Sequence, residues 1–435
     1  MQNRSDRRGA VLSVLATGTV IAGLASCGGS SFYSYDAPNS VVVADFNGDG
    51  FLDIAVASAH IDQTSSSEQP GFVALVLQNA GSPGTFQSSV HFATDGNPSA
   101  MAVGPIAAPG STDLAVANFN KGTISVLLET APNSGTFKNQ VSVPTGVSPS
   151  DVALCDVNGD GQMDLVVSNG NTTTGGSVVY IPQSASSPGQ FGQPVTIGTP
   201  PTYSGASTAV PNAAVGVACG NLNGDGHSMD VAVVSYNQNP TTGYNYGASG
   251  TLSLFFHDPG NPGGFLPRVD IPVAGILHRV KIADVNHDGL PDIIVSNEGV
   301  GSDGVGTPGA VVLLQNPPSG TATTPSFATP VTYQTDIGVS LAVADLNGDG
   351  LPDIVLTSGS DDAIEVLYNN ASAPGTFATP TSYAGLGNPA SVAIGDLNHD
   401  GLPDIATADG TGAIVYFQQS GASAGTFQAG QEVGS

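Results

Sequence analysis

The sequence predicts an all-β fold, a seven-bladed β-propeller of four-stranded antiparallel blades. Three observations lead to this prediction: a nine-residue phrase rich in Asp recurs along the chain, a Phe that ends a Gly/Pro/Ser-rich stretch occurs seven times, and short apolar segments lie between them. No helical periodicity follows the N-terminal segment. Repeats of four short strands are typical of a propeller, in which each blade covers the apolar faces of its neighbours.

The Asp-rich phrase has the spacing D-x-N-x-D-G-x-x-D. It occurs at 45–53, 156–164, 284–292, 345–353 and 396–404, and a form stretched by one residue, with Asn at its first position, occupies 221–230. A seventh, decayed copy keeps only Asp113 and the strand that follows it. Apolar strands are expected on both sides of each copy, such as Val41–Ala44 and Ile54–Ala57 around the first.

Each repeat continues with a third apolar segment, such as Val73–Leu77, then a turn that ends in Phe, then a weaker fourth strand, such as Val90–Ala93. The seven Phe residues are Phe86, Phe137, Phe191, Phe265, Phe327, Phe377 and Phe427. The phrases and the Phe turns therefore give two independent counts of seven blades. Ser31–Tyr35 and the tail Phe427–Val433 both resemble a fourth strand, so either is able to complete the last blade.

Oxygen atoms at positions 1, 3, 5, 7 and 9 of the phrase predict a divalent cation site. Side chains supply the oxygens of positions 1, 3, 5 and 9, a main-chain carbonyl supplies that of position 7, and Gly at position 6 permits the positive φ of a tight turn. Hard oxygen ligands select calcium over zinc or copper. Asn, Gly and Asp also favour ordinary hairpin turns, but six copies at one structural position favour calcium.

Five calcium sites and a weaker sixth are therefore predicted. The ligands in the full copies are Asp45, Asn47, Asp49, Phe51 and Asp53; Asp156, Asn158, Asp160, Gln162 and Asp164; Asp284, Asn286, Asp288, Leu290 and Asp292; Asp345, Asn347, Asp349, Leu351 and Asp353; and Asp396, Asn398, Asp400, Leu402 and Asp404. The weaker site would use Asn221, Asn223, Asp225 and Asp230. The decayed copy at Asp113 is expected to bind no metal.

The blades resemble the FG-GAP or VCBS-type repeats of the integrin α-subunit propeller and of many bacterial surface proteins. The resemblance covers residues from about 36 to 435 and rests on the six loops and on the frame of strands, turns and Phe. It implies that metal binds in the loop between the first two strands of a blade. It leaves the function open, because the fold includes lectins, adhesion heads and some polysaccharide lyases.

Residues 1–26 are predicted to be a lipoprotein signal peptide. A basic start precedes a mostly apolar run, Ala10–Ala25, which is short and Gly/Ala-rich for a membrane span. The run leads into Leu24-Ala25-Ser26-Cys27, which resembles the lipobox of bacterial lipoproteins and implies a lipid on Cys27 and an envelope location, at the outer membrane or the cell surface. Residues 27–35 would form a tether and a possible closing strand. An ordinary secretory signal with a chance Cys is the alternative.

Charge is scarce and mostly negative, with 35 acidic residues against 8 Lys and Arg. A nucleic-acid partner is excluded because phosphates need basic residues, and an anionic membrane surface would repel the chain, which leaves the lipid as its membrane link. After Cys27, the remaining cysteines are Cys155 and Cys219, one and two residues before corresponding loops. Strand alternation points them to opposite blade faces, so two buried thiols are expected.

Two places are candidates for ligand binding. Tyr236, Tyr244 and Tyr246 lie in or next to a long connection on the face opposite the calcium loops and suit stacking on sugars, although a self-packed loop is the alternative. His278, Arg279 and Lys281 form a basic trio where other blades carry small residues, and Arg279 and Lys281 share one strand face near the central channel. The trio could hold an anion such as a uronate or pair with nearby acids.

No catalytic constellation is evident, because the chain has no H-E-x-x-H motif and its His residues and non-loop acids are dispersed. The leading hypothesis is a monomeric, non-enzymatic surface module that binds a glycan or a protein. One alternative is a polysaccharide lyase or hydrolase that acts on acidic glycans with calcium and the basic trio. A structural scaffold of an envelope complex is the other.

Overall fold

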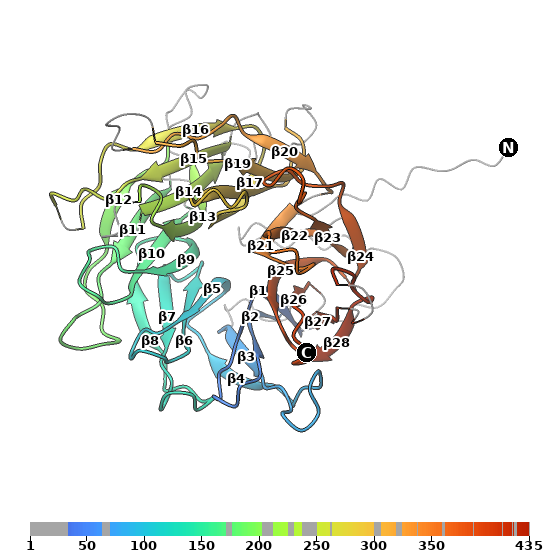
Figure 1. The fold of residues 1–435 in the computed structure, drawn as a ribbon. Coiled ribbons are helices and arrows are strands. Elements are labelled where there is room, and N and C mark those ends of the chain that lie inside the picture. Colours follow the sequence, from blue (N-terminus) through green and yellow to red (C-terminus); the bar gives the residue numbers. More distant parts are fainter. Residues whose placement is uncertain are drawn as a thin grey trace, which may run out of the picture.

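The computed structural model describes residues 34–434 except 63–69, 171–175, 202–211, 225–229, 237–249, 262, 300–305, 319–323, 337, 359–361, 386, 411, 420 and 422–423. Strands β1 to β28 form seven sheets of four consecutive strands each. The sheets stand around a central axis like the blades of a wheel (Figure 1). The predicted seven-bladed propeller is confirmed. Over these described residues, no helix is long and apolar enough to cross a membrane.

The blades follow one another in chain order. Blades 1 to 3 are β1 (Ser34–Ala44), β2 (Asp53–Asp62), β3 (Phe72–Val76) and β4 (Val90–Ala93); β5 (Pro98–Gly104), β6 (Asp113–Asn118), β7 (Thr123–Leu127) and β8 (Val141–Pro144); and β9 (Pro149–Cys155), β10 (Asp164–Asn169), β11 (Ser177–Ile181) and β12 (Val195–Gly198). Blades 4 and 5 are β13 (Ala213–Gly220), β14 (Asp230–Tyr236), β15 (Gly250–Phe255) and β16 (Val269–Val273); and β17 (Leu277–Ala283), β18 (Asp292–Asn297), β19 (Gly309–Leu313) and β20 (Val331–Gln334). Blades 6 and 7 are β21 (Gly338–Ala344), β22 (Asp353–Ser358), β23 (Ala363–Leu367) and β24 (Thr381–Ala384); and β25 (Pro389–Gly395), β26 (Asp404–Asp409), β27 (Ile414–Phe417) and β28 (Gln431–Gly434).

Burial within a blade changes from the axis outward. The first strands line the axis and are half-buried towards their C-terminal ends, as in β5. The second strands, such as β10, are buried at every described position because neighbouring blades cover both of their faces, which explains their continuous runs of Val, Ile, Leu and Ala. The short fourth strands, such as β4, form the mostly exposed outer rim. The core therefore lies between the blades.

Every first strand contains a register shift near its start. Examples are the shift between Leu277 and Val280 in β17 and that between Pro389 and Ser391 in β25. The other five first strands have the same irregularity. A β-bulge bends a strand and re-aims its side chains, so this feature sets which side chains reach the channel.

The C-terminal tail completes the last blade, since β28 pairs with β27. The N-terminal strand β1 belongs to blade 1 and pairs with β2 from Ser34 onward, while residues 31–33 lie outside the described residues. The ring therefore closes by contact between blades 7 and 1. The N–H of Val41 donates to Ser391 Oγ across this contact at 3.1 Å.

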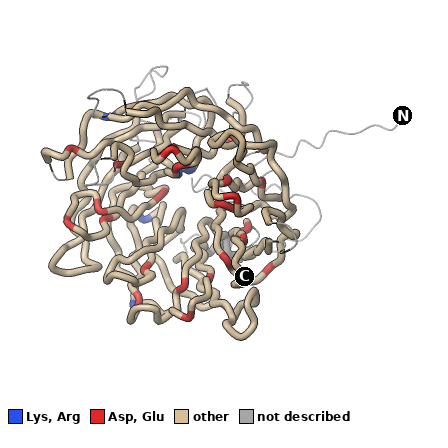
Figure 2. The backbone as a smooth tube through the Cα atoms, viewed as in Figure 1, with Lys and Arg blue, Asp and Glu red and all other residues tan. Residues whose placement is uncertain are grey.

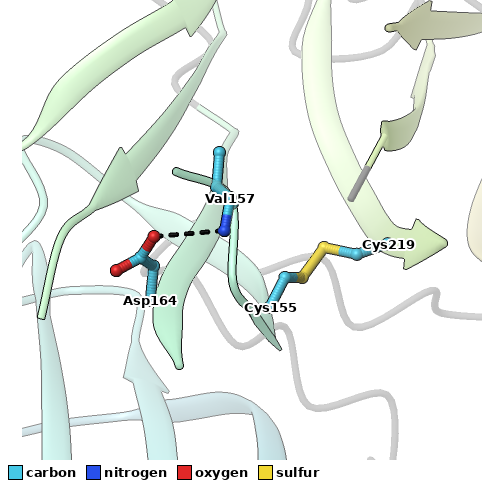
Figure 3. The surroundings of a disulfide bond; sticks show 4 residues. All are labelled: Cys155, Val157, Asp164 and Cys219. Carbon is cyan, nitrogen blue, oxygen red and sulfur yellow. Dashed lines mark hydrogen bonds between the residues drawn. A yellow bond between two sulfur atoms is a disulfide. The ribbon is translucent and has the colours of Figure 1, made fainter. Parts of the chain in front are cut away.

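The ends of neighbouring first strands interlock around the ring. The last residue of one strand meets the second-to-last residue of the next: a Cβ on Gly104 would lie 3.0 Å from Leu154, and one on Gly220 would lie 3.0 Å from Ile282. Cys155 and Cys219 occupy these two positions in blades 3 and 4. A disulfide joins them with a Cα–Cα distance of 6.3 Å (Figure 3).

The expectation of two separate buried thiols is therefore wrong. As strand alternation predicts, Cys155 and Cys219 sit at positions of opposite parity and point to opposite faces of their own blades. Successive blades, however, meet through opposite faces, one from each blade. The face of blade 3 that bears Cys155 therefore meets the face of blade 4 that bears Cys219, which brings the two sulfur atoms together.

Candidate functional site

Each Asp-rich loop is the turn between the first and second strands of a blade. In the loop between β21 and β22, Asp349 N–H donates to Asp345 Oδ1 at 3.2 Å and to Asn347 Oδ1 at 2.8 Å, and Gly350 N–H donates to Asp345 Oδ2 at 2.8 Å. Because one N–H serves the side chains of positions 1 and 3, their oxygens converge inside the loop. Asp349 Oδ1 in turn accepts from Leu351 N–H at 2.9 Å.

The same arrangement recurs in every full copy of the phrase. The side chains of positions 1 and 3 share the N–H of position 5, and position 1 also accepts from the Gly at position 6, in the loops that begin at Asp45, Asp156, Asp284 and Asp396. Position 5 accepts from the N–H of position 7 in each of them. The local sequence thus folds five separate loops in one way.

The Asp at position 9 is the fully buried acidic residue of each loop. Asp353 accepts from Leu346 N–H at 2.9 Å and from Asn369 N–H, just after the third strand, at 2.7 Å. Burial, together with the nearby carboxylates of Asp349 and Asp345, raises its pKa to about 6. The same causes raise the pKa of Asp164 to about 7. Position 9 therefore lies within electrostatic reach of positions 1 and 5.

Two positions of the loop have left-handed backbone. The predicted positive φ of position 6 is confirmed, with 88° at both Gly50 and Gly350. Position 4 is also left-handed, which the sequence did not reveal, because two loops place His there. His287 has φ 55° and His399 has φ 59°. Neither imidazole is among the predicted ligands.

The donor set of the loops fits a calcium ion. Carboxylate and amide oxygens of positions 1, 3, 5 and 9, with the carbonyl of position 7, would hold it. Over the described residues, no group of three or more His, Cys, Asp and Glu side chains is assembled as a metal centre. Loop N–H groups satisfy the carboxylates in this structure. In the loop of blade 6, Asp345 Oδ2, Asn347 Oδ1 and Asp349 Oδ1 each accept one N–H bond and keep a further lone pair for a cation.

The stretched loop of blade 4 is described only in part. Residues 225–229, which include the predicted ligand Asp225, lie outside the described residues. Asp230 keeps its buried place and accepts from His257 N–H at 2.9 Å and from Asn223 N–H at 3.0 Å. In the full copies the N–H of position 2 makes the corresponding bond, whereas here Asn223, at position 3, makes it.

The decayed loop of blade 2 satisfies its one Asp without other carboxylates. Asp113 accepts from Glu129 N–H at 2.8 Å, from Ala107 N–H at 2.7 Å and from the Ser111 hydroxyl at 2.6 Å. Ile106 is 2% exposed and fills the neighbouring core. Pro105, Ala107 and Pro109 stand at positions 1, 3 and 5, where the full copies have acidic and amide side chains.

Amide side chains of the next blade donate to the loops of blades 5 and 6, and these residues were not among the predicted site residues. Asn369 Nδ2 of blade 6 donates to Val285 O in the loop of blade 5 at 2.7 Å, and Gln419 Nε2 of blade 7 donates to Leu346 O in the loop of blade 6 at 3.0 Å. A Cβ on Gly375, in a Phe turn, would lie 2.9 Å from that of Asn286. The recurrence of Gln or Asn after the third strand was the available signal.

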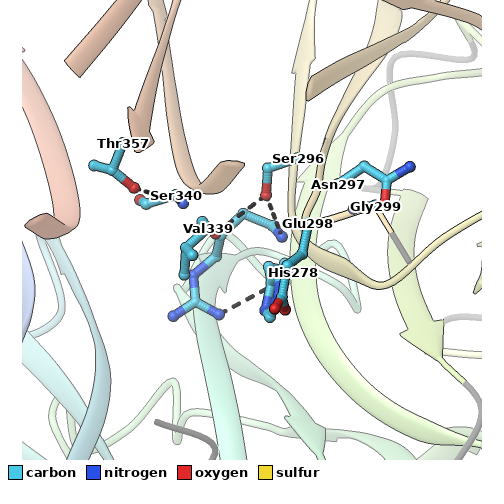
Figure 4. A network of polar contacts seen from close by, with 9 residues as sticks. His278, Ser296, Asn297, Glu298, Gly299, Val339, Ser340 and Thr357 are labelled. Carbon is cyan, nitrogen blue, oxygen red and sulfur yellow. Dashed lines mark hydrogen bonds and ion pairs between the residues drawn. The ribbon is translucent and has the colours of Figure 1, made fainter. Parts of the chain in front are cut away.

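The basic trio divides between two environments. His278 Nε2 lies 2.8 Å from Glu298 Oε2, and both residues belong to the polar network drawn in Figure 4. Arg279 instead donates to the carbonyls of Val215, at 3.2 Å, and Ser99, at 3.4 Å. Lys281 couples electrostatically to Asp151 and Arg279.

The three tyrosines proposed for sugar stacking are not gathered on a described surface. Tyr236 is 4% exposed and packs in the core of blades 4 and 5, so its ring is not available to a ligand. Tyr244 and Tyr246 lie outside the described residues.

Comparison with known proteins supports the fold and its repeats. The FG-GAP-like repeat family matches residues 110–167 and 345–407, and the FG-GAP repeat matches residues 37–61. Integrin alpha-7 of Homo sapiens is 30% identical over 126 residues, which cover 26% of this chain and 11% of the human protein. The chain thus matches about a tenth of that relative's length.

Two solved structures resemble the whole ring. The BP39L lectin of Burkholderia pseudomallei has a TM-score of 0.61 at 15% identity, with 92% of this chain and 100% of the lectin chain covered. A putative 6-phosphogluconolactonase of Bacteroides uniformis has a TM-score of 0.53 at 14% identity, with 88% and 97% covered. At this identity the likeness concerns the fold alone.

Proposed function

Since the chain is a member of the FG-GAP-repeat β-propellers, we propose that it is a calcium-binding, non-enzymatic module of the bacterial envelope that binds a glycan or a protein. The observation that carries this proposal is the identical arrangement of five loops, in which acidic and amide oxygens converge at one structural position. A single hairpin turn has no need of three carboxylates. Five such loops on one ring favour a shared cation chemistry.

Calcium would be held by the side chains of positions 1, 3, 5 and 9 and by the carbonyl of position 7 in each full copy. The ion would supply positive charge to carboxylates that otherwise repel one another. The stretched loop at Asn221–Asp230 would be a weaker sixth site because it has one carboxylate fewer. The loop of blade 2 would remain metal-free.

Binding rather than catalysis fits the described residues. Outside the loops, their carboxylates are dispersed, and His278 and Glu298 form a hydrogen-bonded pair of two half-buried side chains. A lectin and an integrin subunit share the fold or the repeats of this chain, which supports a ligand-binding role. The signal-like N-terminus supports anchoring by a lipid on Cys27 and a place in the cell envelope.

Calcium counting tests the first part of this proposal. We expect the purified chain from residue 36 to bind about five to six ions by elemental analysis after equilibrium dialysis, and Asp349→Ala to bind one fewer. A matched control, Asp113→Asn in the decayed loop, should leave the count unchanged. A count of zero at millimolar free calcium would contradict the assignment.

A glycan array tests the second part. The soluble domain, probed with calcium and then with excess chelator, is expected to bind a limited set of glycans in calcium. Cleavage of an acidic polysaccharide by the soluble domain, in a separate assay, would instead show that the protein is an enzyme. Capture of an envelope protein, with no glycan signal, would show that the ligand of this module is a protein.

A further inference from the structure

Positive charge is concentrated on one strand at the axis of the ring. From Cys27 to the C-terminus the Lys and Arg residues are Lys121, Lys138, Arg268, Arg279 and Lys281. Two of them lie on β17, the first strand of blade 5. Blue segments are correspondingly few among the red ones in Figure 2. Such a concentration in a strongly acidic chain calls for a physical reason.

Lys281 is the long side chain at its level of the channel. It stands three residues before the Asp-rich loop, and the residues at the same position of the other blades are Val42, Ala102, Ala153, Ala218, Ala342 and Ala393. Those six side chains are half-buried, whereas Lys281 is exposed. Solvent therefore reaches the Lys281 side chain at this level of the ring.

Arg279 crosses the channel. Its guanidinium donates to Val215 O in the adjacent blade 4 and to Ser99 O in blade 2, three blades away. Gly216 makes room for this strand, because a Cβ there would lie 2.5 Å from His278 O and 3.1 Å from Arg279 Cα. Since β17 runs towards its calcium loop, Arg279 lies farther from the calcium-loop face than Lys281. Its guanidinium contacts blades 4 and 2 on that far side of the channel.

Main-chain donors share the carboxylate that attracts Lys281. Asp151 of blade 3 accepts from Val152 N–H at 3.0 Å and from Val217 N–H at 3.1 Å. Lys281 forms no ion pair with a described residue, although it is attracted to Asp151. Although solvent reaches this side chain, desolvation by the surrounding protein atoms lowers its pKa, and the charge of Arg279 also lowers it.

We propose that the axial channel binds a carboxylate from the calcium-loop face, with the Lys281 ammonium as its direct ligand and the Arg279 guanidinium as the second donor. Arg279, Lys281 and Asp151 together carry one excess positive charge, which balances the single charge of a carboxylate better than the two charges of a phosphate. Guanidinium and ammonium donors form charge-assisted hydrogen bonds with such an anion. This inference rests on the proposed binding function and names its ligand class, a sugar acid.

The test compares matched sugars by calorimetry on the calcium-loaded domain. D-galacturonate and polygalacturonate are the probes, D-galactose is the neutral counterpart, and inorganic phosphate is the competing anion. We expect galacturonate to bind, galactose not to bind, and Lys281→Met to weaken binding about tenfold or more. Lys138→Met, on an exposed turn, is the matched control and should bind as the wild type does. If polygalacturonate binds and galacturonate does not, the ligand is a carboxylate of a polysaccharide and not a free sugar acid. That result supports the channel site when Lys281→Met abolishes binding of the polymer.

Equal affinity for galactose and galacturonate, or unchanged binding by Lys281→Met, would overturn the inference. Arg279→Lys provides a second variant that keeps the charge but shortens the reach to Ser99, and it should also weaken galacturonate binding. Both variants are to be checked for an unchanged calcium count. If that count is normal and the glycan array gives only neutral ligands, the proposed function stands and the channel inference fails. If no calcium binds, the calcium part of the proposed function fails independently of the channel.

Discussion

His287 and His399 occupy the fourth position of their loops in a left-handed conformation that other loops assign to Gly. A side chain with Cβ adopts this conformation at a cost of roughly 1–2 kcal/mol. The sixth position is left-handed as well, and there all five full copies have Gly. Backbone conformation therefore limits the loop sequence as strongly as its ligand chemistry does.

Gly350→Ala should lower the free energy of unfolding by about 1–2 kcal/mol. The φ of Gly350 is 88°, and a Cβ there would meet no atom within 4 Å, so conformational strain is the only expected cause. Urea unfolding in excess chelator measures this cost without calcium. His287→Gly is the reverse substitution and should be neutral or stabilising by up to about 1 kcal/mol. Equal stability of Gly350→Ala and wild type would contradict the backbone argument.

Asp349→Ala and Asp353→Ala should separate ligand chemistry from structural support within one loop. Asp353 is buried and satisfies Leu346 N–H and Asn369 N–H, so its removal should cost roughly 2–4 kcal/mol both with and without calcium. Asp349 is exposed, so its removal should matter only when calcium is present. Melting curves of both variants and of the wild type, recorded with calcium and with chelator, give the loss of stability of each variant in each condition. A calcium-independent loss from Asp349→Ala would argue against its role as a ligand.

Blades 3 and 4 are joined by a covalent bond that no other interface in the described residues has. Cys155→Ser should lower the free energy of unfolding by about 2–4 kcal/mol, because the cross-link restricts the unfolded chain between residues 64 apart in sequence. Oxidised and reduced wild type should show the same difference. Thiol titration of the denatured, oxidised domain from residue 36 is expected to find no free thiol. Two free thiols would show that the bond does not form.

The sequence predicted what repeats within one blade and missed what depends on two blades. Seven copies of one phrase and one Phe turn gave the blade count, and the left-handed Gly at position 6 followed from the turn. The Cys155–Cys219 bond was missed because strand alternation describes faces of one sheet and says nothing of which faces meet. The reach of Arg279 to Ser99 depends on ring geometry across 180 residues of sequence. Asn369 and Gln419 were missed for the same reason, since their partners lie in the preceding blade.

Contacts between successive blades extend any effect of calcium beyond the loop that binds it. Phe46 O in the loop of blade 1 accepts from Gly135 N–H of blade 2 at 2.7 Å. Leu346 O in the loop of blade 6 accepts from the Gln419 side chain of blade 7. An ion that fixes a loop therefore also fixes the acceptor for its neighbour. The ring is closed by contacts rather than by an exchanged strand, so its stability depends on every interface.

Removal of calcium is therefore expected to lower the melting temperature of the whole ring by several degrees or more. Sites of the extracellular type, with dissociation constants of roughly 0.1–1 mM, would each contribute about 0.5–1.5 kcal/mol at millimolar calcium. Five or six such sites give several kcal/mol, a large share of ordinary protein stability.

Scanning calorimetry in millimolar calcium and in excess chelator measures the shift, and magnesium at the same concentration is the control for ionic strength. Because each loop contacts the next blade, the calcium-dependent shift should appear as one transition of the ring. An unchanged curve in chelator would mean that the loop carboxylates are satisfied by their own N–H groups alone.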